Sequence, residues 1–240
     1  MRGSSDKILL VMRAPRRKGK SVEGIYNELV AELKDILDIE VWHYDDSAGI
    51  VSNLWAIKKR CPAVVHITSD MYYLLPLLSG VRRVMTIHDI GRFKELHGIR
   101  RFIYKWLILK LPAICADAII VVSEYTKTDV LRYIGKSFAS KISVIYNPVP
   151  GLFRFQPKQF NTGTPVILQV GTAKHKNLER IAHALKTIPC ELIIIGELTE
   201  RQHGVLTENG IKYSQYVDLN PEEVYQKYIE CDIVAFVSLH

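Results

Sequence analysis

The 240-residue sequence has few cysteines, and their spacing forms no familiar site. None of the four belongs to a C-x-x-C pair, and no histidine cluster lies beside them; they are Cys61, Cys115, Cys190 and Cys231. Such pairs hold structural zinc, and dense sets of cysteines make disulfide frameworks. The sequence therefore predicts neither feature, and a reducing cytoplasm is the expected compartment.

Long apolar runs are also lacking. The most apolar stretch, 102–123, is interrupted by Lys105, Lys110, Pro112 and Asp117, so it falls short of the roughly 18 apolar residues of a membrane span. Residues 1–20 place their basic cluster after their apolar run, the reverse of a signal peptide. We expect neither a transmembrane segment nor a signal peptide.

Two common catalytic patterns are missing as well. The sequence contains no D-x-D pair, and Asp45 and Asp46 stand alone, so a metal held by paired carboxylates is not expected. No serine nucleophile elbow appears either. With 48% hydrophobic and 24% charged residues, the composition is that of an ordinary globular protein and excludes disordered or collagen-like chains.

The net charge of +7 is unevenly placed. Residues 1–150 carry 23 basic and 15 acidic side chains, a net charge of +8, whereas 151–240 carry 9 and 10, a net of −1. The basic excess belongs to the first part alone, which indicates two units with different surfaces. A basic surface suits an anionic membrane, nucleic acid or a phosphorylated substrate.

Apolar runs alternate with helical patterns, and this rhythm starts twice. Strands are predicted at 7–13, 39–44, 63–69, 81–89, 118–123 and 141–147, and helices at 21–37, 53–60, 72–78, 100–111 and 124–133. After an aperiodic stretch, 148–164, strands follow at 165–171, 191–196, 213–217 and 232–237, with helices at 177–185, 198–207 and 221–229. Strands that are apolar throughout predict parallel sheets with helices on both faces, hence an α/β protein.

The segment GTAKHKN, 171–177, lies between a predicted strand and a predicted helix. Gly171 lets a ligand approach the backbone, N–H groups at a helix start suit a phosphate, and Lys174 and Lys176 can neutralise its charge. The alternative is a solvated basic turn in which Asn177 caps the helix. Spacing alone does not separate the two.

His88 and Asp89 end the predicted strand 81–89, at the edge of a parallel sheet where ligands bind. A histidine there can donate a hydrogen bond to a substrate, with Asp89 fixing its tautomer. The alternative is a histidine packed beneath a loop.

The basic segment APRRKGKS, 14–21, also follows a strand and resembles the end of a P-loop. However, Ala14 replaces the first glycine of that motif, and Pro15 and the basic residues suit a phosphate cradle poorly. A basic loop that contacts an anionic substrate or lipid is the favoured interpretation. The helix 100–111 mixes four cations with aromatic residues, so it fits either a membrane surface or a core helix with solvated lysines.

Taken together, several segments resemble the retaining glycosyltransferases of family 4. They are KGKSVEGIYNEL (18–29), VMTIHDIG (84–91), ADAIIVVSEYTKTDV (116–130), ISVIYNPV (142–149), VILQVGTAKHKNLERIAHAL (166–185) and ECDIVAFVSLH (230–240). Each motif is weak alone, but the ordered set covers nearly the whole chain. The resemblance implies a GT-B fold: an acceptor-side Rossmann-like domain at 1–150, a linker at 151–164 and a partial nucleotide-sugar-binding domain at 165–240.

The resemblance also implies a reaction, transfer of a sugar from a nucleotide sugar to a saccharide or lipid-linked acceptor with retention, as in polysaccharide biosynthesis. His88 and Lys176 would be catalytic, His88 lining the sugar site and Lys176 stabilising the leaving diphosphate without a metal or other cofactor. Donor-binding positions would be Gly171, Thr172, Lys174, Lys176 and Asn177. Acceptor-side positions would be Arg16, Arg17, Lys18, Lys20 and Asp89.

One departure concerns the E-x7-E motif of the family, which would lie beyond His240. We therefore expect this chain to bind the donor poorly and to be a fragment, a truncated gene product or half of an assembly with a complementary C-terminal fragment. The expected location is cytoplasmic, at the inner face of the plasma membrane, with no nucleic-acid partner. The alternatives left open are a non-catalytic, basic membrane- or glycan-binding protein and a P-loop nucleotidase.

Overall fold

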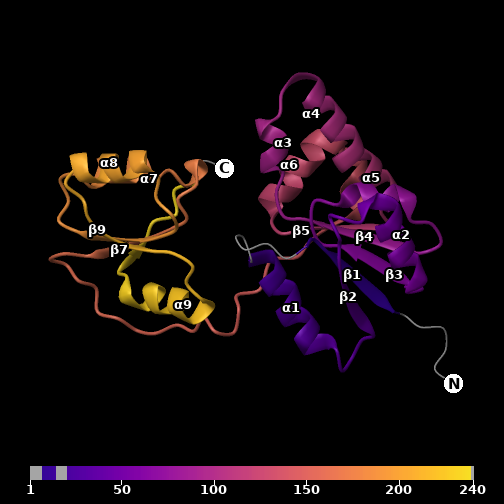
Figure 1. The fold of residues 1–240 in the computed structure, drawn as a ribbon, viewed down its shortest axis with the longest axis horizontal. Helices are drawn as coiled ribbons and strands as arrows, with labels where there is room; N and C mark the ends of the chain where they lie inside the picture. Colours follow the sequence, from indigo (N-terminus) through magenta and orange to yellow (C-terminus); the bar gives the residue numbers. More distant parts are fainter. Residues whose placement is uncertain (1–6, 15–20, 239–240) are drawn as a thin grey trace. The chain divides into compact units, whose positions relative to one another are not determined.

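The computed structural model describes residues 7–14 and 21–238. It divides the chain into two compact units, Met1–Pro148 (unit 1) and Val149–His240 (unit 2). Each unit contains one parallel sheet covered by helices (Figure 1). The predicted α/β fold with parallel sheets is therefore confirmed.

The sheet of unit 1 has six strands in the order β2-β1-β3-β4-β5-β6. The strands are β1 (Ile8–Met12), β2 (Ile39–His43), β3 (Val64–Ile67), β4 (Arg82–Ile87), β5 (Ala118–Val121) and β6 (Ile142–Val144). In the register, Ile8 of β1 lies opposite Ile39 on one side and Val64 on the other. Every predicted strand is present, shortened at its ends where the chain turns into loops.

The helices of unit 1 match the predicted positions better than the predicted types. They are α1 (Ser21–Leu33), α2 (Gly49–Lys59), η1 (Tyr72–Leu77), α3 (Gly91–Glu95), α4 (Gly98–Tyr104), η2 (Lys105–Lys110), α5 (Leu111–Cys115), α6 (Glu124–Ile134) and η3 (Lys136–Lys141). The helix expected at 72–78 is 3-10, since Pro76 inside it has no N–H to donate. The helix expected at 100–111 continues through a π-helical segment, η2, into α5.

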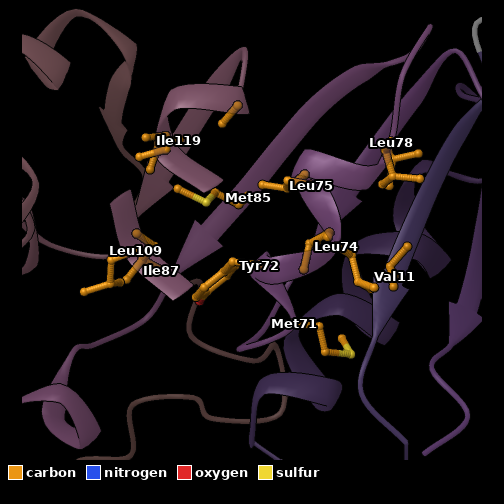
Figure 2. Close-up of a cluster of buried hydrophobic side chains, with 14 of the residues drawn as sticks. Val11, Met71, Tyr72, Leu74, Leu75, Leu78, Met85, Ile87, Leu109 and Ile119 are labelled. Carbon is orange, nitrogen blue, oxygen red and sulfur yellow. The ribbon is translucent and has the colours of Figure 1, made fainter. Parts of the chain in front are cut away.

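Helices cover both faces of this sheet, as expected. Leu10 and Met12 of β1 pack with Tyr26 of α1 on one face, while Leu9 and Val11 point into the other. That second face carries the larger core, which includes side chains from α2, η1, α5 and α6. Figure 2 shows part of it, including Leu74 and Leu75 of η1 and Leu109 of η2. The right-handed crossover rule explains the division, because only the β1–β2 connection runs toward the β2 edge.

Unit 2 has a four-stranded parallel sheet in the order β10-β7-β8-β9. Its strands are β7 (Val166–Val170), β8 (Glu191–Ile195), β9 (Lys212–Tyr216) and β10 (Ile233–Val234), and its helices are η4 (Lys174–Lys176), α7 (Leu178–Leu185), α8 (Glu200–Glu208) and α9 (Pro221–Glu230). Figure 1 shows α7 and α8 on one face and α9 on the other. The edge strand β10 is short and exposed.

The segment between β6 and β7 forms no helix or strand, but much of it is attached to unit 2. Phe153 packs edge-on against Tyr225 and Tyr228 of α9. Asp232, whose side chain is 1% exposed, accepts a hydrogen bond from the Val166 N–H at 2.8 Å and forms an ion pair with Lys158 at 3.0 Å. The stretch expected as a linker therefore lies along unit 2 for part of its length and is not a free tether.

Candidate functional site

The carboxyl ends of β3 and β4 bring polar side chains together in unit 1. Thr68 and Ser69 follow β3, and His88 and Asp89 follow β4, the neighbouring strand. Thr68 and Ser69 are buried, and the Ser69 hydroxyl has no hydrogen-bond partner among the described residues. This is the sheet edge at which open α/β folds bind ligands.

His88 lies at this edge with a fixed ring orientation. Its Nε2 is 3.1 Å from the Thr68 carbonyl oxygen, so Nε2 must carry the proton that is donated. Asp89 is exposed and instead accepts from the Gly91 N–H at 2.8 Å. The expectation that Asp89 fixes the tautomer is therefore wrong, because a backbone carbonyl 20 residues earlier does so.

The protonation state of His88 follows from its surroundings. Burial lowers the pKa of His88, although the Thr68 carbonyl and the charges of Asp89 and Asp70 act in the opposite direction. The ring is therefore neutral near pH 7, and Nδ1 is left as a hydrogen-bond acceptor. A neutral His88 would accept from a substrate hydroxyl at Nδ1, whereas the sequence suggested that it donates.

A second histidine, which sequence reasoning missed, lies on the same face of the sheet. His66 of β3 places Nε2 2.8 Å from the Thr86 hydroxyl, and burial lowers its pKa to about 4, with His88 as a smaller cause. The Tyr26 ring from α1 meets both imidazoles edge-on, at centroid distances of 5.8 and 6.3 Å. The alternation of side chains along β3 was the one available signal, since His66 interrupts an apolar run.

The end of β1 contributes a charged pair. Arg13 Nε donates to Glu23 Oε1 of α1 at 2.6 Å, which raises the pKa of Arg13. This pair fixes the start of the loop that the sequence predicted as an acceptor contact. The remaining acceptor-side candidates, Arg16, Arg17, Lys18 and Lys20, lie outside the described residues, as does most of the segment that resembles a P-loop.

In unit 2 the turn after β7 forms a tight loop around Gly171. Gly171 has φ = 89°, and a Cβ there would lie 3.3 Å from both Cγ and Cε of Lys176. The Lys176 stem therefore crosses directly over the glycine backbone, and its Nζ lies 5.4 Å from the centroid of the Phe236 ring. The positive φ favours glycine at position 171, and a side chain there would also press on the lysine stem.

The helix α7 starts immediately after this turn, but its start differs from the one expected. Asn177 occupies the N-cap position in the left-handed region, with φ = 64°, and its side chain makes no capping hydrogen bond. Asn177 is thus at the N-cap position, as the alternative expected, but its side chain does not cap the helix. Lys174 is exposed on the short helix η4, two residues before Lys176.

Glutamines hold the backbone of this turn, and the sequence did not reveal them. Gln169, 1% exposed, donates from Nε2 to the carbonyls of Gly171 and Lys176, at 3.1 and 3.2 Å. Gln202 of α8 donates to the Thr172 carbonyl at 2.7 Å. The loop after β7 is thus held at three carbonyls by side chains from two elements, so its shape is preorganised.

The turn after β8 packs against the same loop. Thr172 donates from its hydroxyl to the Glu197 carbonyl at 2.6 Å. A Cβ on Gly196, which has φ = 139°, would lie 3.0 Å from the Thr172 methyl group. Gln215 of β9 donates to the Gly196 carbonyl at 3.0 Å. Thr172, a predicted donor contact, is therefore held in place by the turn that follows β8.

Among the residues that the structure describes, no group of three or more histidine, cysteine, aspartate or glutamate side chains converges to hold a metal ion. A cavity of about 300 Å³ lies at the opposite, amino end of β3 and β4, lined by residues such as Val65, Cys61 and Val81. Within the described part of the chain, no helix is both long and apolar enough to cross a membrane.

The chain has the GT-B architecture, which consists of two α/β units that each contain a parallel sheet. In such sheets ligands bind at the loops that follow the carboxyl ends of the strands. Residues 11–150 match the profile of Glycosyltransferase Family 4, so the chain belongs to this family. None of the curated proteins matches the sequence.

Solved structures share the fold at low sequence identity. Anabaena HepE in complex with UDP and glucose has a TM-score of 0.70 at 15% identity, covering 97% of this chain and 74% of its own. The catalytic domain of starch synthase IV from Arabidopsis thaliana, bound to ADP and acarbose, has a TM-score of 0.65 at 9% identity, covering 98% and 79%. MnaA of S. aureus with UDP has a TM-score of 0.60 at 12% identity, covering 95% and 74%.

Proposed function

We propose that this protein transfers a sugar from a nucleotide-sugar donor to a saccharide or lipid-linked acceptor, with retention of the anomeric configuration. The observation that carries the proposal is the loop Gly171–Lys176, in which a lysine stem crosses a glycine of positive φ. The diphosphate of the donor would lie against this loop. The ligands of HepE, UDP and UDP-glucose, make UDP-glucose a sensible first donor to test.

Lys176 is proposed as the main catalytic residue of the donor side. As the bond between the sugar C1 and the diphosphate oxygen breaks, negative charge grows on the diphosphate, and the acceptor oxygen bonds to C1 from the same face while its hydroxyl proton passes to the departing diphosphate. An ammonium group that is already in position stabilises this charge without a metal or other cofactor. Lys174, exposed beside it, would add a second, more mobile positive charge.

His88 is proposed to orient a substrate hydroxyl from unit 1. Its Nε2–H donates to the Thr68 carbonyl, so Nδ1 of the neutral ring would accept a hydrogen bond from the substrate hydroxyl. The basic excess of residues 1–150 suits an anionic or lipid-linked acceptor. We place the reaction on the cytoplasmic side, at the membrane surface, in polysaccharide or glycolipid assembly.

The test is binding and transfer with a panel of UDP-, GDP- and ADP-sugars, measured by titration calorimetry and by release of nucleoside diphosphate. We expect one class of nucleotide to bind and Lys176→Ala to reduce transfer by at least about 100-fold. Lys186→Ala is the matched control, since Lys186 is exposed at the far end of α7. Transfer by Lys176→Ala at the wild-type rate, or transfer abolished by EDTA, would contradict the proposal. An inverted product, seen by NMR, would contradict retention alone.

A further inference from the structure

One long helix of unit 1 exposes an unusually apolar surface. It runs through α4, η2 and α5, from Gly98 to Cys115 (Figure 1). Seven large apolar side chains on it are each between 37% and 70% exposed: Ile99, Phe102, Ile103, Trp106, Leu107, Leu111 and Ile114. Scattered single exposed apolar residues are ordinary, but so many on one helix mark an interaction surface. We call these seven residues the apolar face.

The spacing of these residues places them on one side of the helix. Ile99, Phe102, Ile103, Trp106 and Leu107 follow the three- and four-residue spacing of an α-helical stripe. Leu111 and Ile114 continue the same spacing after Leu107, so the apolar face extends through the π-helical segment η2 into α5.

The opposite side of the helix is anchored in the core of unit 1. Leu109 and Ala113 are 2% and 0% exposed, and Figure 2 shows Leu109 among the buried side chains near Ile87. Arg101 also points to the protein side, because its guanidinium stacks on the Phe93 ring at 4.7 Å. The helix is thus held flat against the unit, and the apolar face points away from it.

The charge of this helix is of one sign. Between Gly98 and Ala116 there are four basic residues and no acidic one. Apart from the inward Arg101, these are Arg100, Lys105 and Lys110, and the Lys110 ammonium lies 4.5 Å from the centroid of the Trp106 ring. Lysine beside tryptophan suits a water–lipid boundary, where the stem lies on apolar surface and the charge meets a lipid phosphate.

We propose that the apolar face docks unit 1 onto an anionic lipid bilayer. The helix would lie in the plane of the membrane, with the apolar face among the acyl chains and Arg100, Lys105 and Lys110 at the headgroups. The excess of positive charge favours an anionic bilayer over an apolar protein surface. This docking rests on the proposed membrane location and assigns it to a particular surface. Its test needs no nucleotide sugar, so the docking can be disproved while the proposed sugar transfer is not.

The experiment is vesicle flotation of the full chain with phosphatidylcholine alone and with added phosphatidylglycerol. We expect binding to the mixed vesicles that weakens as salt is raised. The double substitution Phe102→Gln with Leu107→Gln should lower the partition coefficient at least about tenfold, because two apolar side chains are removed. Lys105→Glu with Lys110→Glu should reduce binding to the anionic vesicles only.

The matched control is Val51→Gln with Trp55→Gln on α2, two side chains that are 82% and 64% exposed outside the apolar face. This control should bind as the wild type does. Unchanged binding by the Phe102 and Leu107 variant, or equal loss in the α2 control, would overturn the proposal. A further result would also overturn it: no vesicle binding, together with a dimer in sedimentation that the Phe102 and Leu107 variant dissociates. That result would assign the apolar face to a second copy of the chain.

Discussion

The two units solve the same problem, a polar site at the end of a parallel sheet, with different means. In unit 1 the site is made of buried and half-buried side chains, notably Tyr26, His66 and His88, whose pKa values are shifted by desolvation. In unit 2 it is a backbone turn that carries the Lys176 side chain and is held in shape by Gly171, Gly196 and the glutamines. The stability of unit 1 should therefore depend on pH, whereas that of unit 2 should depend on substitutions that alter the turn after β7.

The largest expected effect concerns His66 and pH. Because its pKa is about 4 in the folded protein and near 6.5 when unfolded, the unfolded chain binds more protons between these values. The contribution of His66 to the free energy of unfolding of unit 1 is then fully present above pH 6.5. It is lost as the pH falls toward 4, by up to about 3 kcal/mol. His66→Gln should flatten this dependence.

The three tryptophans make the measurement specific, since Trp42, Trp55 and Trp106 all belong to unit 1. Denaturant titrations followed by tryptophan fluorescence at several pH values report on this unit. Amide hydrogen exchange of peptides from unit 2 supplies the comparison, and those peptides should change little between pH 6.5 and 4.5. An equal loss of protection in both units would break the contrast between them.

The next effect concerns Gln169 in unit 2. Gln169→Met keeps the length of the side chain but leaves the carbonyls of Gly171 and Lys176 without their donor. We expect a loss of about 2 kcal/mol in the stability of unit 2, because buried carbonyls lose their partners. Weaker nucleotide-sugar binding should accompany it. Gln156→Met, an exposed glutamine bonded only to the Tyr225 hydroxyl among the described contacts, is the control.

Two glycines of unit 2 should respond in opposite directions. Gly171→Ala forces a positive φ on an alanine and moves its Cβ against Lys176, so it should destabilise unit 2 by about 1–2 kcal/mol. Gly204, inside α8, has open space at its Cβ position, and Gly204→Ala should stabilise by about 0.5–1 kcal/mol. The midpoint of thermal unfolding of both variants measures these effects. Equal shifts would mean that Gly171 does not have the positive φ that this turn requires.

The last pair of effects should be the same in both units. Ser123 caps α6 in unit 1, and Thr199 caps α8 in unit 2 through a capping box. Replacing either residue by alanine should cost about 1 kcal/mol. Hydrogen exchange at the first turn of each helix measures this. A cost confined to one unit would show that the units differ in local structure as well as in their sites.

Much of the fold could be predicted from local pattern. The strands were found because a parallel strand is buried on both faces and therefore reads as an apolar run, as in β1, β5 and β8. Helix types were less predictable, because η1 is a 3-10 helix with Pro76 inside it and η2 is π-helical. The short helix α3 was missed because five residues carry no periodic signal.

The candidate site divides in the same way. Gly171, Lys176 and His88 could be named from the sequence, because strand-end motifs lie close together in the chain and resemble those of a known family. The sequence alone thus determined the fold class and the family, and it named the residues of the proposed site. Only the tertiary structure decided that Thr68 fixes His88, that Gln202 supports Thr172, and that the apolar face is one surface. Those contacts join residues far apart in sequence, or depend on which side of a helix the core covers, and neither leaves a local pattern.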